Sequence, residues 1–250
     1  MLDIILDHKT IRKYKSTLID KQLLNKILDC GIRASNTGNM QTYSIIISTQ
    51  KEIKEKLWEA HFKQNMVLQA PVILTFCADF NRFNKWCLQR KALPGYDNFL
   101  SFFNAAIDAL LVSQNITLAA ESYNLGVCYL GTTTYNADKI VEILGLPKGV
   151  VPVTTLVVGY PDENPGLTDR LPVDAVIHNE IYKDYSNEDI DKFYYEKENS
   201  DLTEELLKTN NKETLAQIFT DNRYKKSDNV LFSRKFLDTI TKQGFMNNAN

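Results

Sequence analysis

Hydrophobic positions follow helical and strand periods along the first 180 residues, and no repeat, low-complexity tract or flexible linker interrupts them. The spacing predicts helices over 2–6, from Asp20 to about 32, over 51–62, over 98–123 and over 137–144. Apolar or β-branched runs predict strands over 43–48, 71–77, 126–130 and 153–159. Strands both neighbour and alternate with helices, so the pattern favours the α+β class.

The segment 98–123 is the most hydrophobic part of the chain, and from Ala105 onward it is apolar on nearly every face. Such a helix is expected to be enclosed rather than to lie on a surface. At about 1.5 Å per residue it would extend roughly 39 Å, more than the width of a small domain. A second subunit is therefore the simplest cover for it. Asp108 and Ser113 lie within the segment and argue against a membrane span.

The chain changes character after Pro161. Residues 164–172 are rich in turn-forming types, and apolar positions become sparse from Lys183 onward. We expect a core over 1–182 and a helical extension over 183–250 packed on that core. Disorder is the alternative for the extension, but it is disfavoured by regularly spaced apolar residues, which include Leu202, Leu206, Leu215, Ile218, Phe236 and Ile240.

Composition removes several functional classes. The net charge of -2 argues against nucleic acid as a partner, and the four scattered cysteines suggest neither a disulfide framework nor a zinc site. The N-terminus lacks the basic region and long apolar run of a signal peptide, which favours a cytoplasmic protein without a membrane partner. The three histidines have no metal-ligand spacing, and hydrolase and Walker motifs are absent. Cofactor chemistry is the main enzymatic option left, and we name no catalytic side chain and no metal ligand.

The first positive signal is a cluster of cations just after the first predicted helix. His8, Lys9 and Arg12 accompany the hydroxyl of Thr10 within five residues. Phosphate groups are bound by such a combination of charge-assisted donors, a hydroxyl and backbone N–H groups. A solvated basic turn is the alternative explanation for the same residues.

The cluster and several later motifs resemble the FMN-dependent nitroreductase family, in particular its NADPH-linked nitroreductases and flavin reductases. The matching segments occur in the family's order: 8–14, the loop Ser35 to Gln41, Gln64 with Ala70-Pro71, 76–82, Ala119 to Gly131 with its Glu121-Ser122, and Asn164-Pro165 through Pro172. The resemblance covers about the first 180 residues. It is looser afterwards, where 208–211 is similar to a segment linked to NADPH selectivity.

The resemblance implies a mixed sheet flanked by helices and an obligate homodimer whose long central helix lies at the interface, where FMN is held. It implies an enzyme that takes electrons from NADPH or NADH by a ping-pong mechanism and passes them to nitroaromatics, quinones or flavins. The positions that it assigns to FMN are His8, Lys9, Thr10, Arg12, Asn36, Gln64, Leu130, Gly131, Thr132, Thr168 and Arg170.

The implied roles differ along the cofactor. His8, Lys9, Thr10 and Arg170 are expected at the phosphate and ribityl end, and Arg12 at the pyrimidine edge of the ring. A fixed cation there would stabilise the negative charge that reduction leaves near N1 and O2. Gln64 is expected to bond the ring edge, and the backbone of 130–132 to meet N5 and O4, which suits Gly131 because it has no Cβ.

Two positions depart from the family pattern, with Thr132 in place of a second Gly and Thr168 in place of Lys. Thr168 and Lys208 keep open a non-enzymatic flavin-binding or sensing protein of the same fold, in which the tail no longer admits nicotinamide. Reductive dehalogenation, or supply of flavin to a partner, is a different task within the same chemistry.

Individual residues also have plainer explanations. Arg12 could be a surface ion-pair partner, Gln64 a loop cap and Lys208 a solvated helix charge, while Cys77 and Cys128 are expected to be small core residues.

Overall fold

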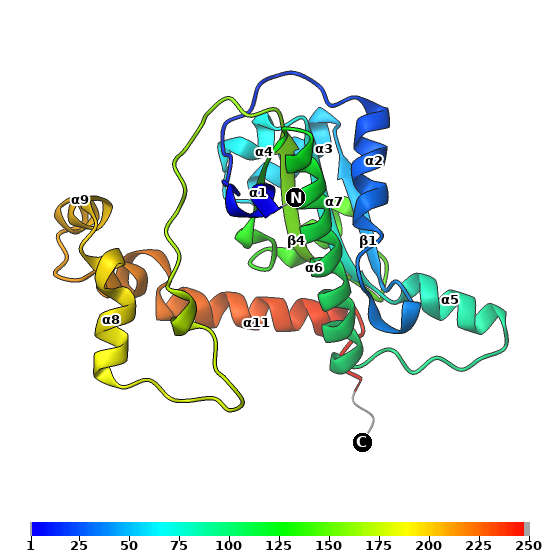
Figure 1. Ribbon diagram of the computed structural model, residues 1–250. Coiled ribbons are helices and arrows are strands. Elements are labelled where there is room, and N and C mark those ends of the chain that lie inside the picture. The colour runs from blue at the N-terminus through cyan, green and yellow to red at the C-terminus, as the bar shows by residue number, and fades with distance from the viewer. Residues whose placement is uncertain (1, 248–250) are drawn as a thin grey trace. The chain divides into compact units, whose positions relative to one another are not determined.

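The computed structural model describes residues 2–247 (Figure 1). The helices are α1 (Leu2–Leu6), α2 (Lys21–Gly31), α3 (Lys51–Ala60), α4 (Asn65–Gln69), α5 (Asn81–Gln89), α6 (Phe99–Ser122), α7 (Ala137–Leu144), α8 (Asn187–Glu198), α9 (Asp201–Asn210), α10 (Leu215–Gln217) and α11 (Lys226–Lys242). The strands are β1 (Tyr43–Ser48), β2 (Val72–Asp79), β3 (Gly126–Tyr129) and β4 (Val150–Gly159).

The strands form a single antiparallel sheet. Within residues 2–247 their order is β1-β2-β4-β3, and each neighbouring pair runs antiparallel. The parallel pairing recorded in that part of the chain is an isolated bridge between Thr10 and Val127. The prediction of a mixed sheet was therefore wrong for the named strands. Their pairing is fixed by contacts between distant segments, which the pattern along the chain does not reveal.

Helices cover both faces of the sheet, which explains the unbroken apolar run of β2. Val72, Leu74 and Phe76 contribute to a core cluster with α2 and α6. Ile73 belongs to a second cluster with residues of α3, α4 and α7. Successive side chains of a strand point to opposite faces, so β2 needs apolar residues at nearly every position. The site described below lies at the edge of this sandwich, next to β3.

Helix α6 runs along the sheet beside α2 (Figure 1). Asn98 caps its start, because the side-chain oxygen accepts a hydrogen bond from the Ser101 N–H at 3.0 Å. Asp108 is buried and accepts bonds from the backbone N–H and the hydroxyl of both Thr37 and Thr42, at 2.8–3.3 Å. The carboxylate thus ties the loop before β1 to the middle of α6.

The other face of α6 is open in the single chain. Phe99, Phe103, Ile107, Leu110 and Leu111 are each 39–51% exposed. The prediction that the helix is enclosed therefore holds for one face only. The apolar stripe formed by these five residues remains uncovered. By length and hydropathy alone α6 could cross a membrane. Its packing against the sheet and its buried polar side chains are those of a core helix.

Several predicted boundaries are confirmed. β1 and α7 have the predicted bounds, and α6 differs from the prediction by one residue at each end. Asp20 caps α2, because its carboxylate accepts bonds from the N–H groups of Gln22 and Leu23. β4 begins three residues before the predicted strand, while α3 ends two residues before the predicted helix.

The chain forms two compact units. Met1–Gly166 and Phe232–Asn250 make up the first, and Leu167–Leu231 make up the second. This grouping differs from the division expected after residue 182, and one of its boundaries falls inside α11. The end of α11 belongs to the first unit, where Ile240 shares a buried cluster with Phe102 and Phe245. The helices predicted for the tail are present as α8 to α11.

Candidate functional site

The cationic N-terminal segment lies along the free edge of β3. The Ile11 N–H donates to the Val127 carbonyl at 2.9 Å, and Thr10 forms a parallel bridge with Val127. Ile11 is buried while Arg12 is exposed, as expected for alternating side chains on an edge strand. Because the two segments run parallel, the chain advances from His8 to Arg12 in the direction in which β3 leads to Gly131.

Two acidic residues hold this segment. His8 Nδ1 lies 2.6 Å from Glu121 Oε1 of α6, so the other ring nitrogen, Nε2, is left for a ligand. Burial raises the pKa of Glu121, and the hydrogen bond and charge of His8 oppose that shift. Glu163 accepts the backbone N–H groups of Arg12 and Lys13. The role of Glu163 is not visible in the sequence, whereas Glu121 lies in one of the matching motifs without a role assigned to it.

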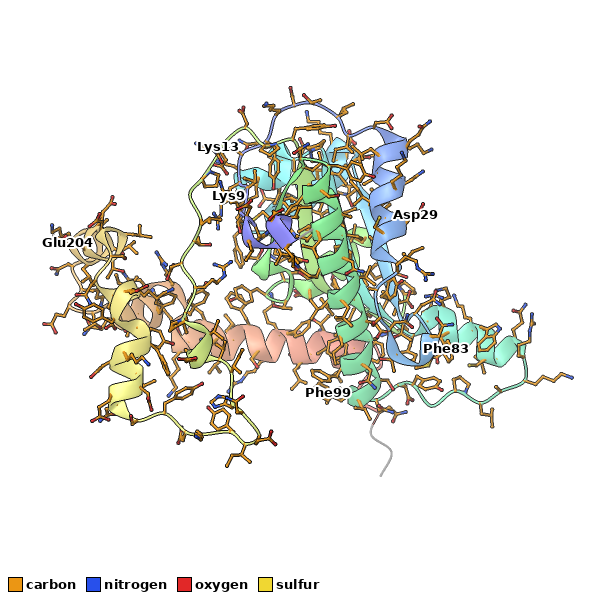
Figure 2. All side chains as sticks on the ribbon, in the orientation of Figure 1. Lys9, Lys13, Asp29, Phe83, Phe99 and Glu204 are labelled. Carbon is orange, nitrogen blue, oxygen red and sulfur yellow. The ribbon has the colours of Figure 1, made fainter. Side chains whose placement is uncertain are left out.

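The cationic groups of Lys9 and Arg12 differ in their neighbours. Lys9, labelled in Figure 2, donates to Asn164 Oδ1 at 3.1 Å. The Arg12 guanidinium has no hydrogen-bond or ion-pair partner among residues 2–247. Its charge acts on Cys128 and lowers the pKa of that thiol against the larger raising effect of burial. The surface ion-pair explanation for Arg12 therefore finds no partner in the described part of the chain.

A turn follows β3 and offers an open backbone. The Leu130 N–H donates to the Thr155 carbonyl at 2.8 Å, which fixes the start of the turn. Apart from the neighbouring residues and the backbone of the same turn, no atom of residues 2–247 lies within 4 Å of the place where a Cβ on Gly131 would stand. The planar face of a ligand could therefore approach this backbone closely.

The side chain of Thr132 meets two others beside that turn. His61 Nδ1 lies 2.8 Å from Thr132 Oγ1, and Gln64 Nε2 donates to the same oxygen at 3.2 Å. Gln64 precedes α4 and does not cap it through its side chain. The structure thus brings together Gln64 and Thr132, two of the residues assigned from the sequence, and adds His61. Nothing in the sequence except its position three residues before Gln64 points to His61.

His61 gives a prediction for the pH dependence of stability. Its side chain is buried, and burial lowers the pKa from 6.5 to about 4. As the pH falls, the unfolded chain therefore takes up this proton at a higher pH than the folded chain does. The stabilisation by neutral His61 is complete above about pH 6.5 and is lost as the pH falls toward 4. Urea titrations at several pH values should show that His61→Asn lowers the pH slope of the unfolding free energy. Equal slopes for the two proteins would contradict this assignment.

Asn36 is not brought to the His8 segment within one chain. Its neighbour Thr37 is bonded to Asp108, whereas His8 contacts Glu121, further along the same helix. At about 1.5 Å per residue these two anchor points on α6 are roughly 20 Å apart.

Thr168 and Arg170 belong to the second unit. Arg170 Nη1 donates to Thr168 Oγ1 and to the Asp169 carbonyl, both at 2.9 Å. Lys208, also in this unit, pairs with Glu204 at 2.6 Å. The assignment of Thr168 and Arg170 to the phosphate end of a cofactor stays a prediction.

One cavity beside the N-terminal segment does not suit a phosphate. It measures about 510 Å³, and its lining includes Lys9. Four carboxylates, those of Asp3, Asp7, Glu121 and Glu163, line the same space. Repulsion between these acids and an anion outweighs the attraction of a single lysine. A phosphate is therefore better placed by His8, Thr10 and Arg12, which do not line this cavity.

The sequence and the fold are shared with known proteins. Residues 5–160 match the Nitroreductase family. FMN reductase (NAD(P)H) of Bacillus subtilis is 34% identical over 217 residues, which cover 83% of this chain and 84% of that protein. A Bacteroides fragilis crystal structure, assigned provisionally as an oxidoreductase, is 50% identical with a TM-score of 0.96, covering 98% of this chain and 99% of that one.

A further solved structure carries a bound nicotinamide cofactor. It is the NADPH:FMN oxidoreductase of Vibrio harveyi in complex with NAD+, which is 27% identical and covers 98% of this chain and 97% of its own, with a TM-score of 0.82. These similarities place the chain in a class of oxidoreductases that includes NAD(P)H-dependent flavin reductases. The chain belongs to the nitroreductase family.

Proposed function

We propose that this protein is an FMN-dependent oxidoreductase that takes electrons from NAD(P)H. The observation that carries the proposal is the parallel alignment of the His8 to Arg12 segment with β3, which leads to the open backbone at Gly131. Cationic and hydroxyl donors thus precede a place where a flat ring can approach. The relatives named FMN reductase and NADPH-flavin oxidoreductase support the same chemistry. They do not favour the non-enzymatic alternative.

The side chains present fit FMN. His8, Thr10 and Lys9 offer an imidazole, a hydroxyl and an ammonium group to a single phosphate and its ribityl chain. The unpartnered guanidinium of Arg12 comes later in the segment, where a cation would face the pyrimidine edge. Arg170 would complete the phosphate site, with Thr168 beside it where the family pattern has a lysine.

When bound, the flavin would supply the two-electron chemistry, in a ping-pong sequence from nicotinamide to a nitroaromatic, quinone or free flavin. The protein's part is to bind and orient. Arg12 would hold negative charge at the ring, and the turn Leu130 to Thr132 would set the distance of the ring from the backbone. No side chain is required as an obligatory proton donor.

A homodimer with the flavin at its interface is part of the proposal. The exposed stripe of α6, with Phe103 and Leu110, provides an apolar surface that a second copy would cover. A dimer would also explain the separation of Asn36 from His8, since Asn36 would then reach the flavin from the second subunit. We propose a cytoplasmic location as well, which agrees with the four unpaired cysteines.

Anaerobic mixing tests the proposed function. The purified protein should be yellow and should release FMN rather than FAD, because the donors of the His8 to Arg12 segment suit a single phosphate and the sequence has no GxGxxG loop for a pyrophosphate. Addition of NADPH without oxygen should bleach the flavin absorbance within seconds. Protein that is colourless and has no affinity for added FMN would disprove the proposal. Bound flavin that NADPH and NADH leave oxidised would point to the sensing alternative.

A further inference from the structure

Three side chains from different elements converge beside the open backbone of Gly131. His61 follows α3, Gln64 precedes α4, and Thr132 lies in the turn after β3. The contacts are 2.8 Å from His61 Nδ1 to Thr132 Oγ1 and 3.2 Å from Gln64 Nε2 to that oxygen. Gln64 Nε2 also lies 3.1 Å from the His61 carbonyl oxygen. The direction of each hydrogen bond can be deduced from these contacts.

The orientation of the Gln64 amide is fixed by the His61 carbonyl. A carbonyl oxygen can only accept, so the group facing it must be the amide NH₂ and not the amide oxygen. The two hydrogens of Nε2 are then directed to the His61 carbonyl and to Thr132 Oγ1. Gln64 Oε1 is left as an acceptor.

The tautomer of His61 follows from its burial. His61 Nε2 is buried without a hydrogen-bond partner among residues 2–247. A proton on Nε2 would be a buried N–H without an acceptor, whereas a proton on Nδ1 leaves only an unused lone pair at Nε2. Buried N–H groups without partners are the rarer of the two in proteins. His61 therefore carries its proton on Nδ1 and donates to Thr132, and burial keeps the ring neutral.

The Thr132 hydroxyl has one hydrogen-bonding position left, which is that of a donor. A hydroxyl accepts two hydrogen bonds and donates one. His61 and Gln64 both donate to Thr132 Oγ1, so its two acceptor positions are filled. Its own hydrogen has no acceptor among residues 2–247 and can be donated to a ligand, since Thr132 is partly exposed.

We propose that Thr132 donates a hydrogen bond to N5 of the oxidised flavin and that His61 is the positioning residue that keeps this donor directed at the ring. The proposal rests on the proposed function, since it needs FMN beside Gly131. N5 accepts a hydrogen bond in oxidised flavin and carries a hydrogen after reduction. A fixed hydroxyl donor at this atom therefore favours the oxidised state.

The flavin analogue 5-deaza-FMN, which has a C–H group in place of N5, tests the contact. Two flavin-free proteins, the wild type and Thr132→Val, are each titrated with FMN and with 5-deaza-FMN. We expect Thr132→Val to weaken FMN binding about three- to tenfold, the effect of one hydrogen bond. Its affinity for 5-deaza-FMN should be unchanged. The flavin potential of Thr132→Val should also be higher than that of the wild type, since the variant loses a contact specific to the oxidised ring.

Matched variants separate the hydroxyl from the turn. Thr132→Ser keeps the hydroxyl and should behave as wild type towards both ligands. Thr134→Val removes a hydroxyl two residues further along the same turn, where Thr134 Oγ1 donates to the Gly131 carbonyl at 3.5 Å. It should also preserve the preference for FMN. If Thr132→Val weakens both ligands equally, the hydroxyl only supports the turn and the proposal is wrong. Wild-type protein that binds neither ligand would instead reject the proposed function.

The positioning role of His61 is tested by the ratio of the affinity for FMN to the affinity for 5-deaza-FMN. His61→Asn places an amide N–H close to the position of Nδ1 and should retain most of the preference for FMN over 5-deaza-FMN. His61→Leu removes the donor and should lose that preference about as far as Thr132→Val does. A preference that survives in folded His61→Leu would overturn the positioning role. If His61→Leu does not fold, His61→Gln, which also lacks a donor at the Nδ1 position, replaces it.

Discussion

Arg12→Ala is expected to slow reduction of the flavin by NADPH about ten- to a hundredfold and to lower the midpoint potential. Removal of a fixed donor to developing charge costs about 3–4 kcal/mol in a closed, preorganised site. Arg12 is exposed and its guanidinium has no recorded partner within residues 2–247, so water should replace part of its effect. Anaerobic stopped-flow reduction and a redox titration measure the two quantities.

Two further substitutions separate the ring from the phosphate. Arg12→Lys keeps the charge but loses the planar guanidinium, so part of the potential should be recovered. Arg170→Ala should weaken FMN affinity and leave the potential of bound flavin nearly unchanged, because its expected place is at the phosphate end. Wild-type potential and reduction rate in Arg12→Ala would show that the role assigned to Arg12 is wrong.

Glutamates on the exposed face of α6 should yield a monomer without flavin. Ile107 and Leu111 are one helical turn apart in the uncovered stripe. In a dimer that covers this stripe, Ile107→Glu with Leu111→Glu would bury unpaired charges from both subunits, which is too costly for the interface to persist. Sedimentation at micromolar concentration and the flavin absorbance of the purified protein provide the measurements.

The control is an equally apolar residue elsewhere on the surface. Leu18 is exposed in the segment before α2, and Leu18→Glu should remain a yellow dimer. Circular dichroism should show that the α6 double variant keeps its helices, since glutamate is a good helix former. If that variant remains a flavin-loaded dimer, α6 is not the interface.

Local pattern predicted individual elements well but not their arrangement. β1 was predicted with its observed bounds because it is a short β-branched run, and α7 because its apolar residues follow the helical period. The direction of strand pairing could not be read from β2. A strand covered on both faces is apolar throughout, whether its neighbours are parallel or antiparallel. Here helices cover both faces of an antiparallel sheet.

The candidate site was predictable where its residues lie in one short motif. The segment from His8 to Arg12 was identified from its residue types and from its resemblance to the family. The side chains that orient it were not. Glu121 and Glu163 lie more than a hundred residues away along the chain, and only folding brings them to His8 and Arg12. The same applies to the contact of His61 with Thr132.

The return of the chain to the first unit at Phe232 has a consequence for proteolysis and for changes of length. The second unit, Leu167–Leu231, is held at both ends, unlike a terminal appendage. A single cut within it would leave the piece that follows still docked through Ile240 and Phe245. The entropy cost of closing such a loop grows only slowly with its length. Residues could therefore be added to or removed from this stretch while the sheet and the segment beside β3 stay intact.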